Sequence, residues 1–271
     1  MPAYLDDILE ATRERLGHRR RQYDLEREIE EREPPRGFLA AIREPGISLV
    51  AEVKRRSPSR GTIQEGADPA AVAAAYERGG ARALSVLTEP YFFGGAIDDL
   101  VAARAACGLP VLRKDFLIDP YQMLEARAAG ADAVLVIVAA AREASRREDL
   151  IGAARELGLD VLVEVHDERE VDQALESGAD LLGINQRDLR TFEIDHGLAA
   201  RLRPRIPAGI AVIAESGLST RAEVEALEQA GLDGILVGEA LMRSGDPEKA
   251  AAELIGRDLG EEGERQDRAQ E

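Results

Sequence analysis

Lysine is the residue type whose placement points most directly to chemistry, because this chain contains so little of it. Of the 35 basic side chains, 32 are Arg and only 3 are Lys. Lys54 and Lys114 end runs that have the composition of β-strands, whereas Lys249 lies in a helical pattern beside Glu248. An ammonium group can lose its proton when burial or a neighbouring cation lowers its pKa, whereas a guanidinium group stays protonated. The first two lysines therefore suggest proton transfer or the binding of an anionic ligand.

Two glutamates occupy similar positions. Glu52 precedes Lys54 by two residues, so both side chains point to the same face of an extended strand. A buried carboxylate needs a partner, and we expect Lys54 or Lys114 to provide it. Glu164 follows an apolar run and is well placed for general acid–base catalysis. We interpret His166 as a loop residue before the next helix rather than as a base.

The elements that position these residues alternate regularly from residue 48 onward. Apolar runs predict eight strands, at 49–53, 83–87, 111–113, 133–138, 161–165, 181–184, 211–214 and 234–237. The intervening stretches predict helices, among them 69–78, 98–106, 121–128, 143–157, 168–176 and 221–229. Eight such units over roughly 210 residues indicate an α/β protein with the (β/α)8 TIM barrel fold. A doubly wound open sheet is the alternative, but no G-x-G-x-x-G follows the first strand.

The chain divides into three parts. Residues 1–47 are expected to form an N-terminal helical extension, because residues 5–16 carry an apolar stripe at helical spacing and 38–42 predict a further short helix. Residues 48–256 are the expected barrel domain, and 257–271 are expected to be a polar tail.

The composition excludes several classes of protein. The chain has 52 acidic residues against 35 basic ones, a net charge of −17, which argues against nucleic acid and anionic membranes as partners. One cysteine and three scattered histidines disfavour disulfides and a zinc site. The longest apolar run, residues 133–141, is too short to span a bilayer, and the first residues do not resemble a secretory signal. We expect a soluble, cytoplasmic monomer without a metal site.

In a barrel of this kind the active site lies at the carboxyl ends of the strands. Besides the residues already discussed, the polar or glycine residues expected there are Ser57, Thr88, Glu89, Asp115, Asn185, Arg187, Glu215, Ser216, Gly217, Gly238 and Glu239. In many barrels the loops after the last two strands bind a phosphate through backbone N–H groups. Gly217 and Gly238 would allow that close approach.

Seven segments combine these residues with their neighbours: AEVKRRSPSRG (51–61), LTEPYFFGG (87–95), VLRKDF (111–116), LVEVHD (162–167), GINQRDLRTFEID (183–195), IAESG (213–217) and GILVGEALMR (234–243). In order and at suitable spacings, they resemble segments of the indole-3-glycerol phosphate synthase family. The resemblance covers about residues 36–245, and the charged N-terminal helix also resembles the family's extension. It implies a carboxy-lyase of tryptophan biosynthesis that uses neither a metal nor an organic cofactor. Its substrate would be a small molecule, 1-(2-carboxyphenylamino)-1-deoxyribulose 5-phosphate, which undergoes ring closure, decarboxylation and dehydration.

The resemblance also implies roles for individual residues. Lys54 matches the position that binds the aryl carboxylate, Lys114 the general acid and Glu164 the acid–base residue of dehydration. Glu52 matches the carboxylate that orients the lysines. Either lysine could donate a proton in one step and bind in another, so their division of roles stays open.

The remaining matches concern the substrate's surroundings. Three of them line the substrate, namely Asn185, Glu215 and Ser216, and four resemble the phosphate end, namely Gly217, Gly238, Ser57 and Arg187. Some relatives have Ser where this chain has Glu239. We expect only the backbone of Glu239 to face the phosphate, because its carboxylate would repel that group.

Two alternatives to this function are a phosphosugar isomerase of tryptophan or histidine synthesis and a catalytically silent barrel that serves as a binding partner. An isomerase needs no cation dedicated to an aryl carboxylate, so Glu52 and Lys54 together with Lys114 favour the synthase. A silent barrel would tolerate loss of Lys114 or Glu164, and both are present.

Replacement of Lys114 by Arg separates proton donation from anion binding. Lys114→Arg keeps the charge but cannot donate a proton at neutral pH, so we expect it to lose most of kcat. Steady-state kinetics with the carboxyphenylamino substrate measure this loss. Near-normal turnover would show that Lys114 only anchors an anionic group.

Overall fold

Eight parallel strands form a closed barrel in the computed structural model, which describes residues 4–19, 25–58, 61–188 and 191–259. The strands are β1 (Ser48–Val53), β4 (Ala83–Leu87), β5 (Val111–Lys114), β6 (Ala133–Ile137), β7 (Asp160–Val165), β8 (Leu181–Asn185), β9 (Ala211–Glu215) and β10 (Gly234–Val237). Because β1 pairs with both β4 and β10, the sheet closes, and the open-sheet alternative is wrong. The predicted (β/α)8 fold is confirmed, and each strand end lies within one residue of its expected position.

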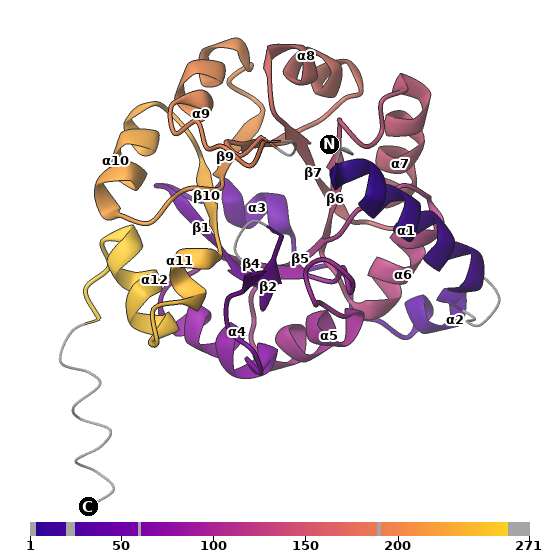
Figure 1. The fold of residues 1–271 in the computed structure, drawn as a ribbon, viewed down its shortest axis with the longest axis horizontal. Coiled ribbons are helices and arrows are strands. Elements are labelled where there is room, and N and C mark those ends of the chain that lie inside the picture. The colour runs from indigo at the N-terminus through magenta and orange to yellow at the C-terminus, as the bar shows by residue number, and fades with distance from the viewer. Residues whose placement is uncertain (1–3, 20–24, 59–60, 189–190, 260–271) are drawn as a thin grey trace, which may run out of the picture.

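Helices surround the barrel and alternate with its strands (Figure 1). They are α4 (Pro69–Arg78), α5 (Ile97–Ala106), α6 (Tyr121–Ala129), α7 (Ala144–Glu156), α8 (Glu168–Glu176), α9 (Leu198–Leu202), the 3-10 helix η1 (Arg203–Arg205), α10 (Arg221–Gln229), α11 (Glu239–Met242) and α12 (Pro247–Ile255). A short hairpin of β2 (Arg56–Ser57) and β3 (Gly61–Thr62) follows β1 and was not predicted. None of the helices in the described ranges is both long and apolar enough to cross a membrane.

Local sequence explains where the helices begin. The Asp68 side chain accepts a hydrogen bond from the Ala70 N–H, and Pro69 occupies the first position of α4, where its missing N–H costs nothing. Thr220 and Glu223 form a reciprocal capping box at the start of α10. These caps fix the residues at which α4 and α10 begin.

The short helix α3 (Phe38–Ile42) fills the amino-terminal end of the barrel. The side chains of Phe38 and Ile42 are fully buried, in one apolar cluster with Val50 and Leu112 from the barrel interior. The Asp160 carboxylate at the start of β7 accepts a hydrogen bond of 2.8 Å from the Leu39 N–H. The predicted short helix is therefore confirmed, and it belongs to the core.

The first helix, α1 (Tyr4–Arg19), lies at the opposite end of the barrel and to one side of it, in front of α6 and α7 at the right of Figure 1. Its predicted apolar stripe is buried: Leu5, Ile8 and Leu9 share a cluster with residues of β6. The Tyr4 ring lies edge-on to the ring of Phe92, with 5.2 Å between the ring centroids. It also lies edge-on to the ring of Phe192 in the loop after β8, with 5.5 Å between the centroids. The charged segment that follows contains α2 (Leu25–Glu30), while residues 20–24 lie outside the described part.

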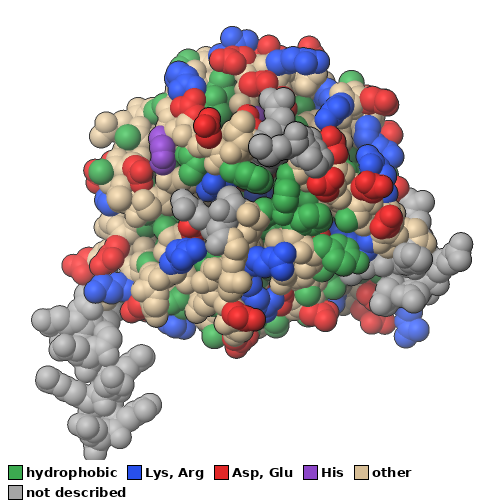
Figure 2. Space-filling view, viewed as in Figure 1, with side chains coloured by type: hydrophobic (Ala, Val, Ile, Leu, Met, Phe, Trp, Pro, Cys, Tyr) green, Lys and Arg blue, Asp and Glu red, His purple; other side chains and the backbone are tan. Residues whose placement is uncertain are grey.

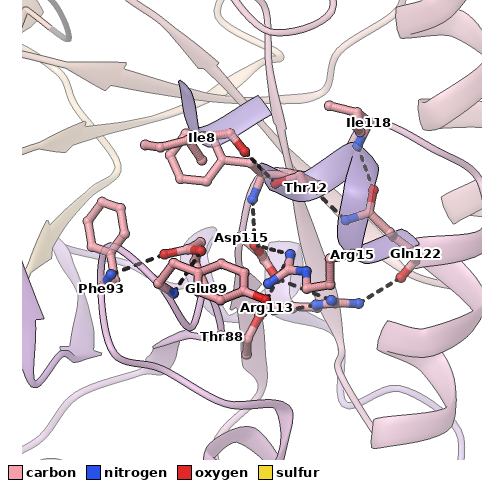
Figure 3. A network of polar contacts seen from close by, with 12 residues as sticks. Ile8, Thr12, Arg15, Thr88, Glu89, Phe93, Arg113, Asp115, Ile118 and Gln122 are labelled. Carbon is pink, nitrogen blue, oxygen red and sulfur yellow. Dashed lines mark hydrogen bonds and ion pairs between the residues drawn. The ribbon is translucent and has the colours of Figure 1, made fainter. Parts of the chain in front are cut away.

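A buried polar network fastens α1 to the barrel (Figure 3). The Arg15 guanidinium lies 3.3 Å from Asp115 Oδ1, at the carboxyl end of β5. Asp115 also accepts hydrogen bonds from the Thr88 hydroxyl at 2.8 Å and from Arg113 at 3.2 Å. Burial would raise the pKa of Asp115, but the charges of Arg113 and Arg15 outweigh it and lower the pKa. The network therefore holds an ionised carboxylate at the residue that follows Lys114 in the chain.

Truncation of Phe38 tests the contribution of α3 to the barrel core. We expect Phe38→Ala to reduce the free energy of unfolding by about 3–5 kcal/mol, because it removes a fully buried aromatic ring. Urea unfolding measures the loss, and Tyr91→Ala, at a side chain that is 60% exposed, is the matched control. Equal stability of the two variants would show that α3 is not part of the cooperative core.

Candidate active site

One cavity of about 420 Å³ opens at the carboxyl ends of the strands. Thirteen of the fifteen residues expected at the carboxyl ends line it: Glu52, Lys54, Ser57, Lys114, Asp115, Glu164, Asn185, Arg187, Glu215, Ser216, Gly217, Gly238 and Glu239. Thr88 and Glu89 are buried but do not line the cavity. Figure 2 shows hydrophobic side chains gathered near the middle of the face seen in Figure 1, with many acidic side chains towards its edge. The strands thus bring together residues that are up to about 190 positions apart in the chain.

Two lysine–carboxylate groups line the floor of the cavity. Lys54 Nζ lies 2.5 Å from Glu52 Oε1. Lys114 Nζ lies 2.9 Å from Glu215 Oε2 and 3.4 Å from Glu164 Oε2, and its side chain is only 13% exposed. Since β5, β7 and β9 each contribute one of these last three residues, the ammonium group is held from several sides of the barrel.

This arrangement gives the two carboxylates beside Lys114 different protonation behaviour. Burial raises the pKa of both, but Lys114, His166 and Asn185 outweigh burial at Glu164 and lower its pKa to about 2. At Glu215, burial and the Glu164 charge outweigh Lys114 and raise the pKa to about 7. Burial alone would lower the pKa of Lys114, but the three surrounding glutamates raise it. The site therefore combines a charged ammonium, an ionised carboxylate and a carboxyl group that titrates near neutrality.

Hydrogen bonds fix the orientation of Glu164. Asn185 Nδ2 donates to Glu164 Oε1 at 3.1 Å, and the Ser216 hydroxyl donates to Asn185 Oδ1 at 2.9 Å. The backbone N–H of Arg187 donates to the same Asn185 oxygen at 3.1 Å, so the amide cannot flip without losing partners. Ser216 has a φ of 69°, a left-handed conformation that a non-glycine residue adopts at a cost of about 1–3 kcal/mol.

Two glycines leave space that the carboxylates occupy. A Cβ at Gly183 would overlap Glu215 Oε1, and a Cβ at Gly238 would overlap Glu52 Oε1. Glu215 Oε1 is buried and has no hydrogen-bond partner among the described residues. Gly238 thus leaves room for Glu52 in addition to its expected close approach to a phosphate, which stays a prediction, and the role of Gly183 was not anticipated.

The residues expected at the phosphate end all line the cavity. The Ser57 hydroxyl is buried and has no hydrogen-bond partner within the described residues. Gly217 has a φ of 80° and starts the turn before α10. Glu239 Oε1 lies 3.4 Å from the Arg243 guanidinium, one turn along the same helix.

The apolar half of the cavity was missed in the sequence. Phe93 and Phe116 line it with ring centroids 6.1 Å apart, and Tyr4, Leu5 and Ile8 of α1 also line it. The apolar stripe of α1 was recognised, but periodicity says nothing about what a stripe covers. The described ranges also contain no group of three or more His, Cys, Asp or Glu side chains that could hold a metal ion, at the site or elsewhere.

Opposite pH dependences of stability are expected for Glu164→Gln and Glu215→Gln. The pKa of Glu164 is about 2, below its ordinary value of 4.5. Its ionised form therefore stabilises the fold above pH 4.5, and this contribution is lost as the pH falls towards 2. The pKa of Glu215 is about 7, so its contribution is fully present below 4.5 and is lost as pH rises through 7.

Glu164→Gln should therefore be least stable relative to wild type near neutral pH, and Glu215→Gln should gain relative stability between acidic and neutral pH. Urea unfolding from about pH 3.5 to about pH 8 measures both differences. Parallel pH profiles of the two variants would contradict the assigned protonation states.

Known proteins that resemble this chain in sequence belong to the family whose motifs contribute the residues of the cavity. A sequence model of the indole-3-glycerol phosphate synthase family matches residues 5–254. The chain is 56% identical over 223 residues to indole-3-glycerol phosphate synthase 2 of Streptomyces coelicolor, covering 82% of this chain and 86% of that protein. It is 51% identical over 255 residues to indole-3-glycerol phosphate synthase of Mycolicibacterium gilvum, covering 93% of each. Thiamine phosphate pyrophosphorylase from Pyrococcus furiosus shares the fold alone, with a TM-score of 0.58 at 19% identity over 77% of this chain and 93% of that one. From the family match and these relatives, the chain belongs to the indole-3-glycerol phosphate synthase family.

Proposed function

We propose that the chain converts 1-(2-carboxyphenylamino)-1-deoxyribulose 5-phosphate to indole-3-glycerol phosphate, as a carboxy-lyase of tryptophan biosynthesis. A carbon–carbon bond forms between the aryl carbon and the sugar carbonyl carbon, and carbon dioxide and then water leave. The observation that carries the proposal is the position of Lys114, whose ammonium group contacts both Glu164 and Glu215 inside the cavity.

Lys114 is the proposed general acid of ring closure. Its raised pKa keeps it protonated until a substrate oxygen develops negative charge, and donation to the carbonyl oxygen then relieves that charge. Glu215, 2.9 Å away and with a pKa of about 7, can exchange a proton with Lys114. Glu164 remains ionised and is the proposed acid–base residue of dehydration.

The other residues bind and orient the substrate in this proposal. Lys54, held by Glu52, is the cation for the aryl carboxylate, and its pairing with Glu52 limits its motion. The aryl ring fits the apolar side formed by Phe93 and Phe116. The phosphate is bound by the residues expected at the phosphate end, among them Gly217 and Ser57, whose hydroxyl is unpaired among the described residues.

The alternatives account for fewer of these features. A phosphosugar isomerase needs an acid–base pair but no second lysine beside an apolar aryl pocket. A catalytically silent barrel needs none of the paired charges, which are costly to bury.

The proposal also includes the division into an extension at 1–47, a barrel at 48–256 and a tail at 257–271. A monomeric state, a cytoplasmic location and the absence of nucleic acid partners rest on the net charge of −17 and the single cysteine.

A direct assay tests this function. We expect purified protein mixed with the carboxyphenylamino substrate to produce indole absorbance and fluorescence without added metal or cofactor. The chain contains no Trp, so the protein's own background is low. The Lys114→Ala variant is the negative control, because it removes the proposed acid. Absence of product at micromolar wild-type enzyme would overturn the assignment.

A further inference from the structure

His166 lies between two carboxylates just after β7. Its Nε2 is 3.3 Å from Glu164 Oε1, and its Nδ1 is 3.0 Å from Glu170 Oε2 in the first turn of α8. The imidazole is only 15% exposed. An imidazole with a carboxylate at each nitrogen is best satisfied when both nitrogens carry protons, that is, as an imidazolium.

The histidine reaches the cavity only through Glu164. The residues that line the cavity include Glu164 but not His166, so the ring lies behind the carboxylate and away from the space for a substrate. Glu164 Oε1 faces His166 and Asn185, whereas Oε2 faces Lys114. Nε2 has no partner of hydrogen-bond geometry within the described residues, so its contact with Glu164 is mainly electrostatic.

Glu170 is itself fixed in place. Its backbone N–H donates to the Asp167 side chain at 2.8 Å, which caps α8. Its Oε2 accepts a second hydrogen bond, from the His166 backbone N–H at 2.8 Å. A carboxylate that binds both the backbone and the ring of one residue sets the position of that ring.

We propose that His166 is a positioning residue for Glu164: an imidazolium, held by Glu170, that orients this carboxylate and gives it a positive neighbour independent of Lys114. The charge of Lys114 disappears whenever it donates its proton, and Glu164 would then be a buried carboxylate without a cation. His166 supplies the cation at that moment. This inference rests on the proposed role of Glu164, and it adds a function to a residue that the sequence presented as part of a loop.

The electrostatics agree with the geometry. Burial would lower the pKa of His166, but Glu164 and Glu170 outweigh it and raise the pKa to about 10. The charged groups that face the ring are Glu164 from β7 and Glu170 from α8, with Lys114 from β5 on the far side of Glu164. His166 is therefore charged at neutral pH.

NMR of the imidazole nitrogens in isotopically labelled protein tests the charge without any use of activity. At about pH 7.5 we expect both His166 nitrogens to be protonated, whereas an ordinary histidine is largely neutral there. Glu170→Gln should lower the titration midpoint of His166 by about one pH unit or more, because a paired charge is lost. Glu168→Gln, an equal charge change at an exposed position in the same helical turn, should leave it unchanged. A neutral His166 in the wild-type protein would overturn the proposal.

Kinetics of substituted enzymes test the positioning role. We expect His166→Asn to lower kcat roughly tenfold, less than the ~10²–10⁴-fold contribution of an acid–base residue itself, with little change in KM. His166→Lys, which keeps the positive charge, should recover part of that loss. In a Glu164→Gln background the His166→Asn substitution should have no further effect, because it acts only through Glu164.

The outcomes distinguish this inference from the proposed function. If the wild-type enzyme makes no product, the function fails, and the NMR result still reports on the histidine. If the wild-type enzyme is active and His166→Asn has unchanged kcat, or adds its full loss in the Glu164→Gln background, the positioning role is overturned.

Discussion

The burial of one ammonium group, that of Lys114, is the constraint on which the site depends. A buried charge is costly unless opposite charges and hydrogen bonds surround it. Glu164 and Glu215 meet that demand from two other strands, but two carboxylates beside one cation create a new imbalance. The balance is restored by a proton near Glu215 and by a second cation, His166, near Glu164. The chemistry of the site follows from this distribution of charge.

The barrel alone does not account for the cavity. The N-terminal extension contributes at both ends, since α3 fills the amino-terminal end and three residues of α1 line the cavity at the other end. The Arg15–Asp115 contact ties α1 to the residue directly after the end of β5. Apolar side chains of α1 line the cavity, and an apolar lining strengthens the electrostatic interactions next to it. The extension therefore belongs to the environment of the site as well as to the fold.

Much of this architecture could be predicted from the sequence, for identifiable reasons. Parallel strands that are buried on both faces appear as apolar runs, so the eight strands and the polar residues at their ends were evident. The apolar stripe of α1 predicted a buried face but not what that face would contact. His166 stands two residues after Glu164, yet its second partner, Glu170, is brought to it by the turn into α8. Contacts made across a turn or between distant segments depend on tertiary geometry, which periodicity does not contain.

Gly183 and Gly238 make room for the carboxylates of Glu215 and Glu52. Neither glycine carries a reactive group, yet a single added methyl at either position would push a carboxylate away from its lysine. Such a change would retune proton transfer while every reacting side chain stayed in the sequence. A change in side-chain volume at position 183 or 238 would therefore alter proton transfer at the site without replacing any reacting residue.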